Sequence, residues 1–467
     1  MVAFFYVLAL LAVGLSVFQT RPLRTGAPSA IREPARKDLV LFALLCAVLC
    51  ATFALQIALT DRAVLSQAPL PDWFRALPLL YFAPYPPIAA AVDESLIQWT
   101  QVLAVVESVI LLGMYFALRR IDCRGRAFAA VTFLSMAILS VIALRSVTTD
   151  VDSYLYIGNA LVWTHEYVAP PIPFAGEDAV INRMWGMPLL PSAYGPLWGL
   201  IAKLSLGGTR TLWQQAFEMR LLGLISIAVC VAYVTRLQRS SVTALLFALD
   251  PAMYVRYLIR AHNDLTGVAL ILVAAAARKR TWLAVLLVAA AGTIKFPLLL
   301  GGLIVFWDRP TLAKRLTPAL AAALLAAGAS WVFGGPAYAN ALKVLYRFYD
   351  HSPSPAEQVF HLLLVAVAFG AVALALIRRR FLFGAGWSFV SLGQFPLAHY
   401  LAWCLPYVLL GEATAIPFLV SWPALDQALT LEYPYTPFFL FERSAAVIAV
   451  IAAVGLALLS HRSKRNA

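Results

Sequence analysis

Long apolar runs separated by short polar segments occupy most of the chain. A helix needs about 20 apolar residues to cross roughly 30 Å of hydrocarbon, and the longer runs reach this length. A helix satisfies its own backbone hydrogen bonds inside a bilayer, whereas an open strand does not. The pattern therefore predicts an all-α, polytopic transmembrane helical bundle of about 13 spans. The expected spans are 2–19, 39–60, 97–118, 127–147, 213–236, 241–259, 265–277, 281–294, 297–307, 316–334, 359–377, 384–410 and 441–460.

Three consecutive runs in the middle of the chain, at 265–277, 281–294 and 297–307, are too short to cross a bilayer alone. We expect these segments to be tilted, broken or merged with their neighbours.

Composition excludes a soluble fold. The chain has 467 residues, of which 62% are hydrophobic and 13% are charged, and a soluble core cannot bury that much apolar surface. The net charge of +13 would suit nucleic acid, but the cations lie in short clusters between apolar runs, as in membrane loops. We therefore expect the lipid bilayer as a partner and no nucleic acid.

The basic residues define the orientation. Of the 36 Lys and Arg residues, 23 fall in one alternating set of short loops, which the positive-inside bias makes cytoplasmic. The N-terminus is then outside and the C-terminus is cytoplasmic. The long loops at 61–96, 148–212, 335–358 and 411–440 are extracytoplasmic. Abundant alanine and more arginine than lysine suggest a GC-rich bacterial genome, so we expect the bacterial cytoplasmic membrane.

The apolar segment 196–206 would invert every later loop if it were a span. We expect instead a juxtamembrane helix in the outer interface, with Trp198 and Lys203 as surface anchors. The outer loop 148–212 then stays continuous, and a loop of this length is usually functional.

An acidic pair opens this loop. Asp150 and Asp152 directly follow an apolar run, and acids at a membrane edge usually serve proton chemistry, a metal or a cation. Two positions one residue apart share a side in an extended segment and point apart in a helix. The alternative is a structural pair that caps the following helix.

Cations that could hold an anion lie near the same outer side. Lys295 lies between two short apolar runs, where an unused charge costs about 2–3 kcal/mol. Arg256 and Arg260 are one helical turn apart, and Arg220 lies at an outer span end. The alternative for each arginine is to extend toward lipid headgroups.

Three polar residues open the run at 265–277: His262, Asn263 and Asp264. Asp264 would orient His262 or bind a ligand hydroxyl, or these residues would cap the helix. Glu107 is a lone acid within another expected span. Its carboxyl group either hydrogen-bonds within the bundle or marks a polar cavity, and the sequence does not distinguish these two roles.

Taken together, the chain over roughly 127–410 resembles the GT-C superfamily of polytopic glycosyltransferases. It is similar to the polyprenol-phosphate-mannose mannosyltransferases and to the GPI mannosyltransferase I type. The matching pieces are Asp-Val-Asp-Ser-Tyr at 150–154, Ser-Ala-Tyr-Gly-Pro-Leu at 192–197, Arg220, Ala-His-Asn-Asp-Leu at 261–265, Thr-Ile-Lys-Phe-Pro at 293–297, and Tyr-Leu-Ala-Trp-Cys-Leu-Pro at 400–406. In that family the acidic loop usually follows the first span, whereas here it follows the fourth. Asp93 and Glu94 in an earlier outer loop are the alternative match.

The resemblance implies inverting transfer of a sugar, with mannose expected, from a polyprenyl-phosphate donor to a glycolipid or glycan acceptor on the extracytoplasmic face. Such transfer needs a carboxylate base for the acceptor hydroxyl and cations for the departing phosphate. The base is expected at Asp150 or Asp152. The expected phosphate contacts are Lys295, Arg260, Arg256 and Arg220, and the expected substrate contacts are Tyr154, Tyr194, His262, Asn263 and Asp264. No cofactor or metal is expected. The alternative is Mg²⁺ or Mn²⁺ at the acidic pair, with His165 and Glu166 completing a site of irregular spacing.

We expect three parts: N-terminal spans over 1–126, as an accessory segment; a GT-C-like catalytic core over 127–410; and an outer loop with a C-terminal span over 411–467. Two other functions fit the pattern less well. A transporter or flippase of a lipid-linked or anionic substrate would place its polar groups near the midplane, in paired repeats. A surface-polysaccharide polymerase or ligase would share the donor and the side of the membrane.

Overall fold

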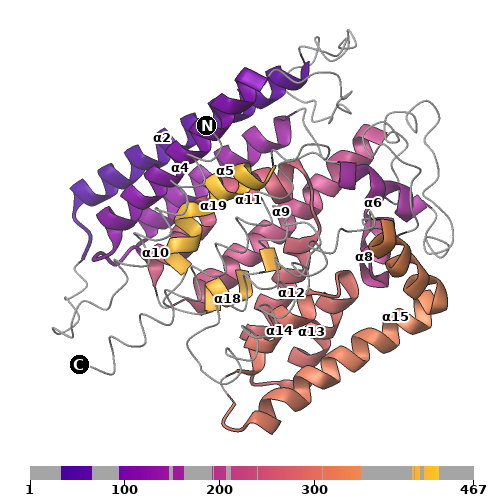
Figure 1. Cartoon of the computed structure of the whole chain (residues 1–467). Coiled ribbons are helices and arrows are strands. Elements are labelled where there is room, and N and C mark those ends of the chain that lie inside the picture. The colour runs from indigo at the N-terminus through magenta and orange to yellow at the C-terminus, as the bar shows by residue number, and fades with distance from the viewer. Residues whose placement is uncertain are drawn as a thin grey trace, which may run out of the picture.

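The computed structural model describes residues 33–65, 94–146, 151–161, 192, 194–206, 212–238, 240–307, 309–348, 402–403, 405–410 and 415–430. Every element of this part is a helix (Figure 1). The longer helices are α2 (Arg36–Leu65), α4 (Glu94–Leu118), α5 (Arg126–Arg145), α9 (Leu212–Leu237) and α15 (Leu312–Phe348). The shorter ones are α6 (Val151–Leu161), α8 (Pro196–Ser205), α10 (Ser241–Leu249), α11 (Pro251–Tyr254), α12 (Asp264–Ala276), α13 (Thr281–Ile294), α14 (Leu298–Gly302), α18 (Leu405–Leu410) and α19 (Ala415–Thr430).

Five helices of the described part are long and apolar enough to span a membrane, and a sixth is reached if α10 and the segment after it form one bent span. The five lie in α2, α4, α5, α9 and α15, so an all-helical membrane protein is confirmed. Four of them match the expected runs at 39–60, 97–118, 127–147 and 213–236, and α15 extends beyond the run expected at 316–334. The expected spans 2–19, 359–377 and 441–460 lie outside the described residues, as does 384–410 except for 402–403 and 405–410.

The expected span 241–259 is broken at Asp250. The Asp250 carboxylate accepts a hydrogen bond from the backbone N–H of Ala252 at 3.0 Å, and Pro251 occupies the first helical position. An acidic N-cap followed by proline is a helix start signal. The chain therefore bends by 45° and begins a new helix, which passes into a π-helix over Val255–Ile259.

The short central runs form helices, as expected. Helices α12 and α13 contain 13 and 14 residues, or about 20 Å at 1.5 Å per residue. Helix α14 continues into a 3₁₀ turn at Leu303–Phe306. Most residues of these three helices are buried, so they form the centre of the molecule.

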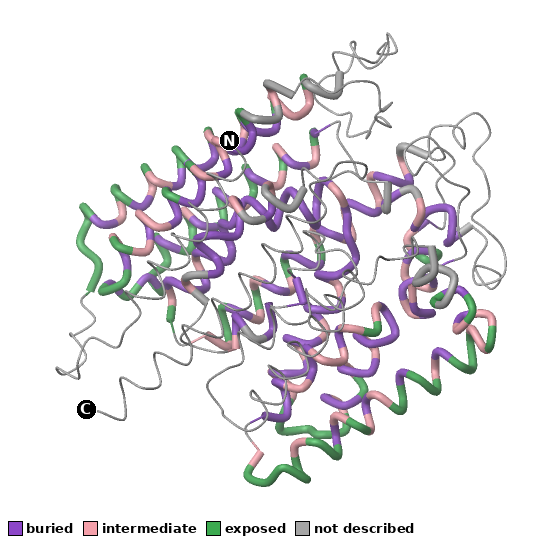
Figure 2. Tube along the Cα trace, in the orientation of Figure 1, coloured by how far each residue is buried: buried purple, intermediate pink, exposed green. Residues whose placement is uncertain are grey.

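The core is continuous from α2 to α19. Helix α4 packs against both α2 and α19, and α12 packs against both α9 and α13. Figure 2 shows that buried residues line the inner sides of these helices, while much of α15 is exposed. The exposed side of α15 is apolar, with Leu320, Leu324, Trp331, Val332 and Phe333 among the most exposed residues. An apolar exposed stripe suits contact with lipid.

One hydrogen bond between distant segments marks each of two opposite ends of the bundle. At one end, the basic loop between α4 and α5 meets the start of α10, where Ser241 Oγ accepts from the backbone N–H of Cys123 at 3.2 Å. At the opposite end, Ser146 donates to Asp61 at 2.7 Å. Helices α6 and α8 lie at that second end, far from α10 (Figure 1).

Helices α6 and α8 pack on each other and form a second, smaller core. Trp198 of α8 is buried in this core, while Lys203 is exposed. The expectation that Trp198 is a surface anchor is therefore wrong. Its indole lies against the ring of Tyr156 on α6, a contact that the helical pattern of 196–206 alone does not reveal.

Candidate active site

The Tyr-Gly-Pro motif at 194–196 is held against the end of α13. The backbone N–H of Gly195 donates to the carbonyl oxygen of Ile294 at 3.1 Å. A Cβ at Gly195 would overlap the carbonyl oxygen of Thr293, so only glycine allows this approach. Two motifs that are about 100 residues apart are thereby joined, and Lys295 follows directly.

Lys295 and Asp264 form an ion pair at the centre of the site. Lys295 Nζ lies 2.9 Å from Asp264 Oδ1, with the Lys295 side chain 14% exposed and the Asp264 side chain 0% exposed. The indole Nε1 of Trp403 donates to the same carboxylate oxygen at 2.6 Å. A buried ion pair persists only where further hydrogen bonds satisfy its charges, and Trp403 supplies one of them.

Two aromatic rings flank the Lys295 ammonium. Its nitrogen lies 5.7 Å from the ring centroid of Tyr194 and 5.6 Å from that of Trp403. Both distances are within the range of a cation–π contact. The ammonium is thus fixed by one carboxylate and two rings, and it remains partly accessible.

Tyr156 connects this cluster to α6. Its hydroxyl donates to Asn263 Oδ1 at 3.4 Å, and its ring makes edge contacts with Tyr194 and Trp198 at centroid distances of 4.8 and 5.1 Å. Tyr156 is not among the site residues expected from the sequence. The buried positions of α6 include Ser153, Tyr156 and Ala160, and this helical spacing was the available signal.

The first turn of α6 is anchored near the expected base. Ser153 Oγ donates to the carbonyl oxygen of Arg260 at 2.8 Å, and Asp152 is the second residue of α6. Asp150 lies outside the described residues, as do the side chains of Asp152 and Tyr154. The structure therefore brings the first turn of α6, which contains Asp152, to the end of the π-helix, and the assignment of the base stays a prediction.

His262 is buried directly after this π-helix. Its backbone N–H donates to the carbonyl oxygen of Arg256 at 3.3 Å, across the left-handed residue Ala261 with φ of 52°. A non-glycine residue in this conformation is strained, and such strain gathers at functional sites. The strained turn places His262, Asn263 and Asp264 at the start of α12.

Arg220, one of the expected phosphate contacts, is hydrogen-bonded to backbone carbonyl groups of the protein. Arg220 is fully buried and donates to the carbonyl oxygens of Leu144, Ser146 and Ile259 at 3.1, 2.7 and 3.2 Å. These contacts join α5, α9 and the π-helix, and they favour a structural role for Arg220 over the expected phosphate contact. Arg260 remains half-buried at the same end.

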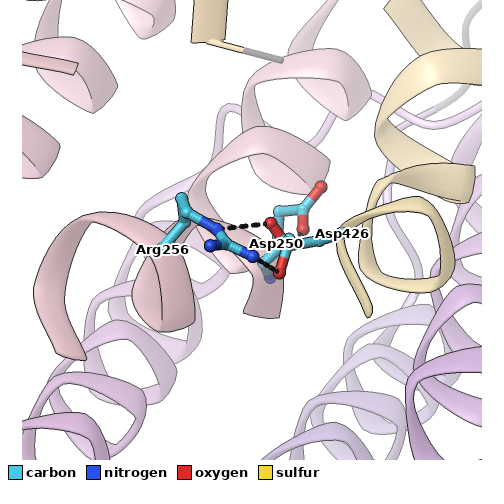
Figure 3. A network of polar contacts seen from close by, with 4 residues as sticks. Asp250, Arg256 and Asp426 are labelled. Carbon is cyan, nitrogen blue, oxygen red and sulfur yellow. Dashed lines mark hydrogen bonds and ion pairs between the residues drawn. The ribbon is translucent and has the colours of Figure 1, made fainter. Parts of the chain in front are cut away.

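Arg256 makes a two-pronged contact with Asp426 of α19, at 2.9 and 3.0 Å (Figure 3). Both side chains are at most 3% exposed. This pairing also favours a structural role for Arg256, and sequence reasoning missed Asp426 because it lies 170 positions away. Asp250 lies beside the pair in Figure 3, and the buried Glu107 of α4 belongs to the same bundle interior.

The residues of the alternative assignments are only partly described. Among the residues that the structure describes, no three His, Cys, Asp or Glu side chains are grouped as metal ligands would be. His165, Glu166 and Asp93 lie outside that part of the chain, and Glu94 begins α4. A divalent metal at the acidic pair thus stays an untested alternative.

Comparison with known proteins finds one family model that matches part of the chain. Residues 88–309 match the sequence model of the MptA_B family, described as alpha-(1->6)-mannopyranosyltransferase, N-terminal domain. The matched range runs from the segment before α4 to three residues beyond the 3₁₀ turn, and includes Lys295, Asp264 and Tyr194. Neither a curated protein nor a solved structure matches the chain. Residues 88–309 are therefore similar to the N-terminal domain of alpha-(1→6)-mannopyranosyltransferases, and the chain is a membrane glycosyltransferase.

Proposed function

We propose that the protein is an inverting mannosyltransferase. It takes mannose from a polyprenyl-phosphate donor and transfers it to a lipid-linked or envelope glycan acceptor at the extracytoplasmic face of the membrane. The observation that supports this proposal best is the fixed ammonium of Lys295, held by Asp264 between two aromatic rings.

The chemistry requires a cation for the leaving group. Negative charge develops on the donor phosphate as the bond to the sugar breaks, and a prepositioned cation stabilises that charge. Lys295 fits this role because its position is set by Asp264 and Trp403 before any substrate arrives. Arg260, half-buried at the start of the same turn, is the second candidate.

The acceptor requires a base. A carboxylate within hydrogen-bond reach removes the proton of the attacking hydroxyl as the new bond forms. We assign this role to Asp150 or Asp152, because Ser153 ties their segment to the carbonyl of Arg260 beside the cation site. The acceptor would then lie between the start of α6 and the donor.

The expected linkage fixes the configuration of the donor. A single displacement inverts the anomeric centre, so an α-(1→6) product requires a β-linked mannosyl phosphate. The purified protein in lipid should therefore use a β-linked polyprenyl-phosphate-mannose and reject the α-linked anomer. Transfer from the α-linked donor with retention would overturn the inverting mechanism.

Substitutions test the assigned roles. Asp152→Asn or Asp150→Asn should abolish transfer of labelled mannose, while expression and thermal unfolding stay as in the wild type. Lys295→Met should reduce transfer by 100-fold or more, by analogy with the loss of one oxyanion donor. Lys203→Met is the matched control, because Lys203 is exposed on α8, and it should transfer normally.

Two results would contradict the proposal. Full transfer in both aspartate variants would remove the base assignment. Movement of the lipid-linked sugar across proteoliposomes, without any glycosylated product, would instead identify a flippase.

A further inference from the structure

Several buried polar atoms near the Lys295 site have no hydrogen-bond partner in the described part of the chain. They are both amide atoms of Asn159, Nδ2 of Asn263, Oδ2 of Asp264 and Nε1 of Trp198. Each of these residues is at most 4% exposed. Folded proteins rarely leave such groups unsatisfied, and each instance calls for a physical reason.

Tyr156 contacts two of these residues, Asn263 and Trp198. The Tyr156 hydroxyl donates to Asn263, and its ring contacts the indole of Trp198. Asn159 lies one helical turn beyond Tyr156 on α6, so both positions fall on the same face of the helix. Asp264 follows Asn263 and holds Lys295. Tyr156 therefore links Trp198 and Asn263 to the cation site, and Asn159 lies on the same face of α6 as Tyr156.

The mixture of donors and acceptors identifies the chemistry of the missing partner. An amide offers two donors and one acceptor, an indole N–H only donates, and a carboxylate oxygen only accepts. A phosphate would leave Asp264 Oδ2 and the Asn159 carbonyl unsatisfied, and a metal ion would leave the N–H groups unsatisfied. A hydroxyl both donates and accepts, so several neighbouring hydroxyls match the whole set. Aromatic rings beside them suit the apolar face of a sugar ring.

We propose that Asn159 and Asn263 form a hexose subsite whose amides hydrogen-bond to sugar hydroxyls. This inference rests on the proposed mannosyltransferase function and adds the residues that select the sugar. The sugar comes either from the donor or from the acceptor. A donor sugar would lie next to its own phosphate on Lys295, and an acceptor mannose would lie on the other side of the reacting bond.

Replacement by a side chain of similar size tests the subsite. Asn159→Leu removes an amide that is unsatisfied within the described residues, so the ligand-free protein should unfold at the same or a higher temperature. The same variant should raise KM for polyprenyl-phosphate-mannose about tenfold, as expected for the loss of one or two hydrogen bonds. If the sugar belongs to the acceptor, KM for a short α-(1→6)-linked mannose oligosaccharide should rise instead.

Donors lacking one ring hydroxyl sharpen the test. The wild type should discriminate against one such analogue by about tenfold or more in kcat/KM, because its buried amide is then left unpaired. Asn159→Leu should lose this discrimination, because the variant and the analogue remove the same interaction. Asn263→Ser provides a second variant, and it retains a small polar group if leucine disturbs the fold.

Gln56→Leu on α2 is the matched control, since Gln56 Oε1 is also buried without a partner in the described part. Gln56 lies among α2 and α4 residues, where its amide donates to Thr100, and its variant should keep the wild-type KM values and discrimination.

Two outcomes would overturn the subsite. One is a lower unfolding temperature for Asn159→Leu with unchanged KM values, which would make Asn159 structural. The other is unchanged discrimination between the donors. Protection of the purified protein against thermal unfolding by polyprenyl-phosphate-mannose separates this inference from the proposed function. If the wild type binds this lipid without transferring mannose, the transferase proposal fails, and the subsite stands only if Asn159→Leu abolishes the protection.

Discussion

At the scale of single residues, Lys295 depends on two partners that the chain supplies from distant positions. Asp264 begins α12, and Trp403 lies 139 positions further along the chain. Lys295 Nζ contacts Asp264 Oδ1, and Trp403 Nε1 donates to the same oxygen, so the carboxylate orients the ammonium and the indole orients the carboxylate. Sequence reasoning identified Lys295, Asp264 and Tyr194 individually. It could not pair them, because helical spacing relates only residues within a few turns of each other.

Asp264→Asn tests this arrangement. The amide still accepts from Trp403 but leaves the Lys295 charge without its carboxylate, which costs up to about 3 kcal/mol of unfolding free energy for a buried pair. The partial exposure of Lys295 lowers that figure. Thermal unfolding in lipid nanodiscs and transfer of labelled mannose should both decrease. Trp403→Phe keeps the ring and loses only the N–H donor, so it should lower activity less than Asp264→Asn. Equal activity of Asp264→Asn and wild type would rule out the orienting role.

At the scale of elements, close backbone contacts decide where the site forms. The approach of Gly195 to the end of α13 brings Tyr194 to Lys295. The bend at Asp250, the π-helix and the strained Ala261 turn the chain so that α12 begins at the site. The start signals at Asp250–Pro251 are readable in the sequence. The π-helix is not, because it arises where one extra residue is accommodated in tertiary packing.

Gly195→Ala should separate α8 from α13. The new Cβ overlaps the carbonyl oxygen of Thr293, and relief of that overlap costs about 1–3 kcal/mol. Mannose transfer should fall about 100-fold, as expected for a displacement near 1 Å. Gly113→Ala on α4 is the matched control, because its Cβ would meet no atom within 4 Å. This control should gain about 0.5–1 kcal/mol of stability. Wild-type transfer in Gly195→Ala would show that this contact does not set the site.

At the scale of the whole molecule, α19 is tied to the π-helix through Arg256 and Asp426 (Figure 3). This contact joins a segment beyond the family match to the matched region. A buried ion pair is sensitive to the loss of one partner but can often be replaced as a unit by apolar residues. Its role is therefore separable from that of Lys295.

Asp426→Leu alone should destabilise the protein by about 3–5 kcal/mol, because Arg256 would be left buried and uncompensated. The double variant Arg256→Met with Asp426→Leu should recover most of this loss in the same thermal unfolding measurement. Restored mannose transfer in the double variant would exclude phosphate binding by Arg256. A double variant that is stable but inactive would support phosphate binding by Arg256.

The orientation of the whole molecule can be tested by labelling. Lys203 on α8 and Arg120 between α4 and α5 are both exposed, and α8 lies toward the end of the bundle opposite the start of α5 (Figure 1). In sealed right-side-out vesicles, an impermeant maleimide should label Lys203→Cys and not Arg120→Cys. Reaction of Arg120→Cys alone would invert the proposed orientation.

The native cysteines allow this measurement. Cys46, Cys50, Cys123 and Cys230 are buried, and a Cys404→Ser background removes the fifth. Between α4 and α5, burial raises the pKa of the Cys123 thiol to about 11. The reactive species is the thiolate, so Cys123 should stay unlabelled at pH 7. Its reactivity should increase only as the pH approaches that value.

The sequence by itself determined the class of protein, most helix positions and the segments that carry chemistry. Hydrophobic periodicity and the cost of a buried charge act locally, so runs such as 97–118 and residues such as Lys295 could be read directly. Only the tertiary structure decided which of these residues meet. It placed Lys295 against Asp264 and Trp403, and it buried Trp198 against Tyr156. It also bonded Arg220 to backbone carbonyls and Arg256 to Asp426. These contacts depend on how helices pack across tens to hundreds of positions, and no local pattern records that packing.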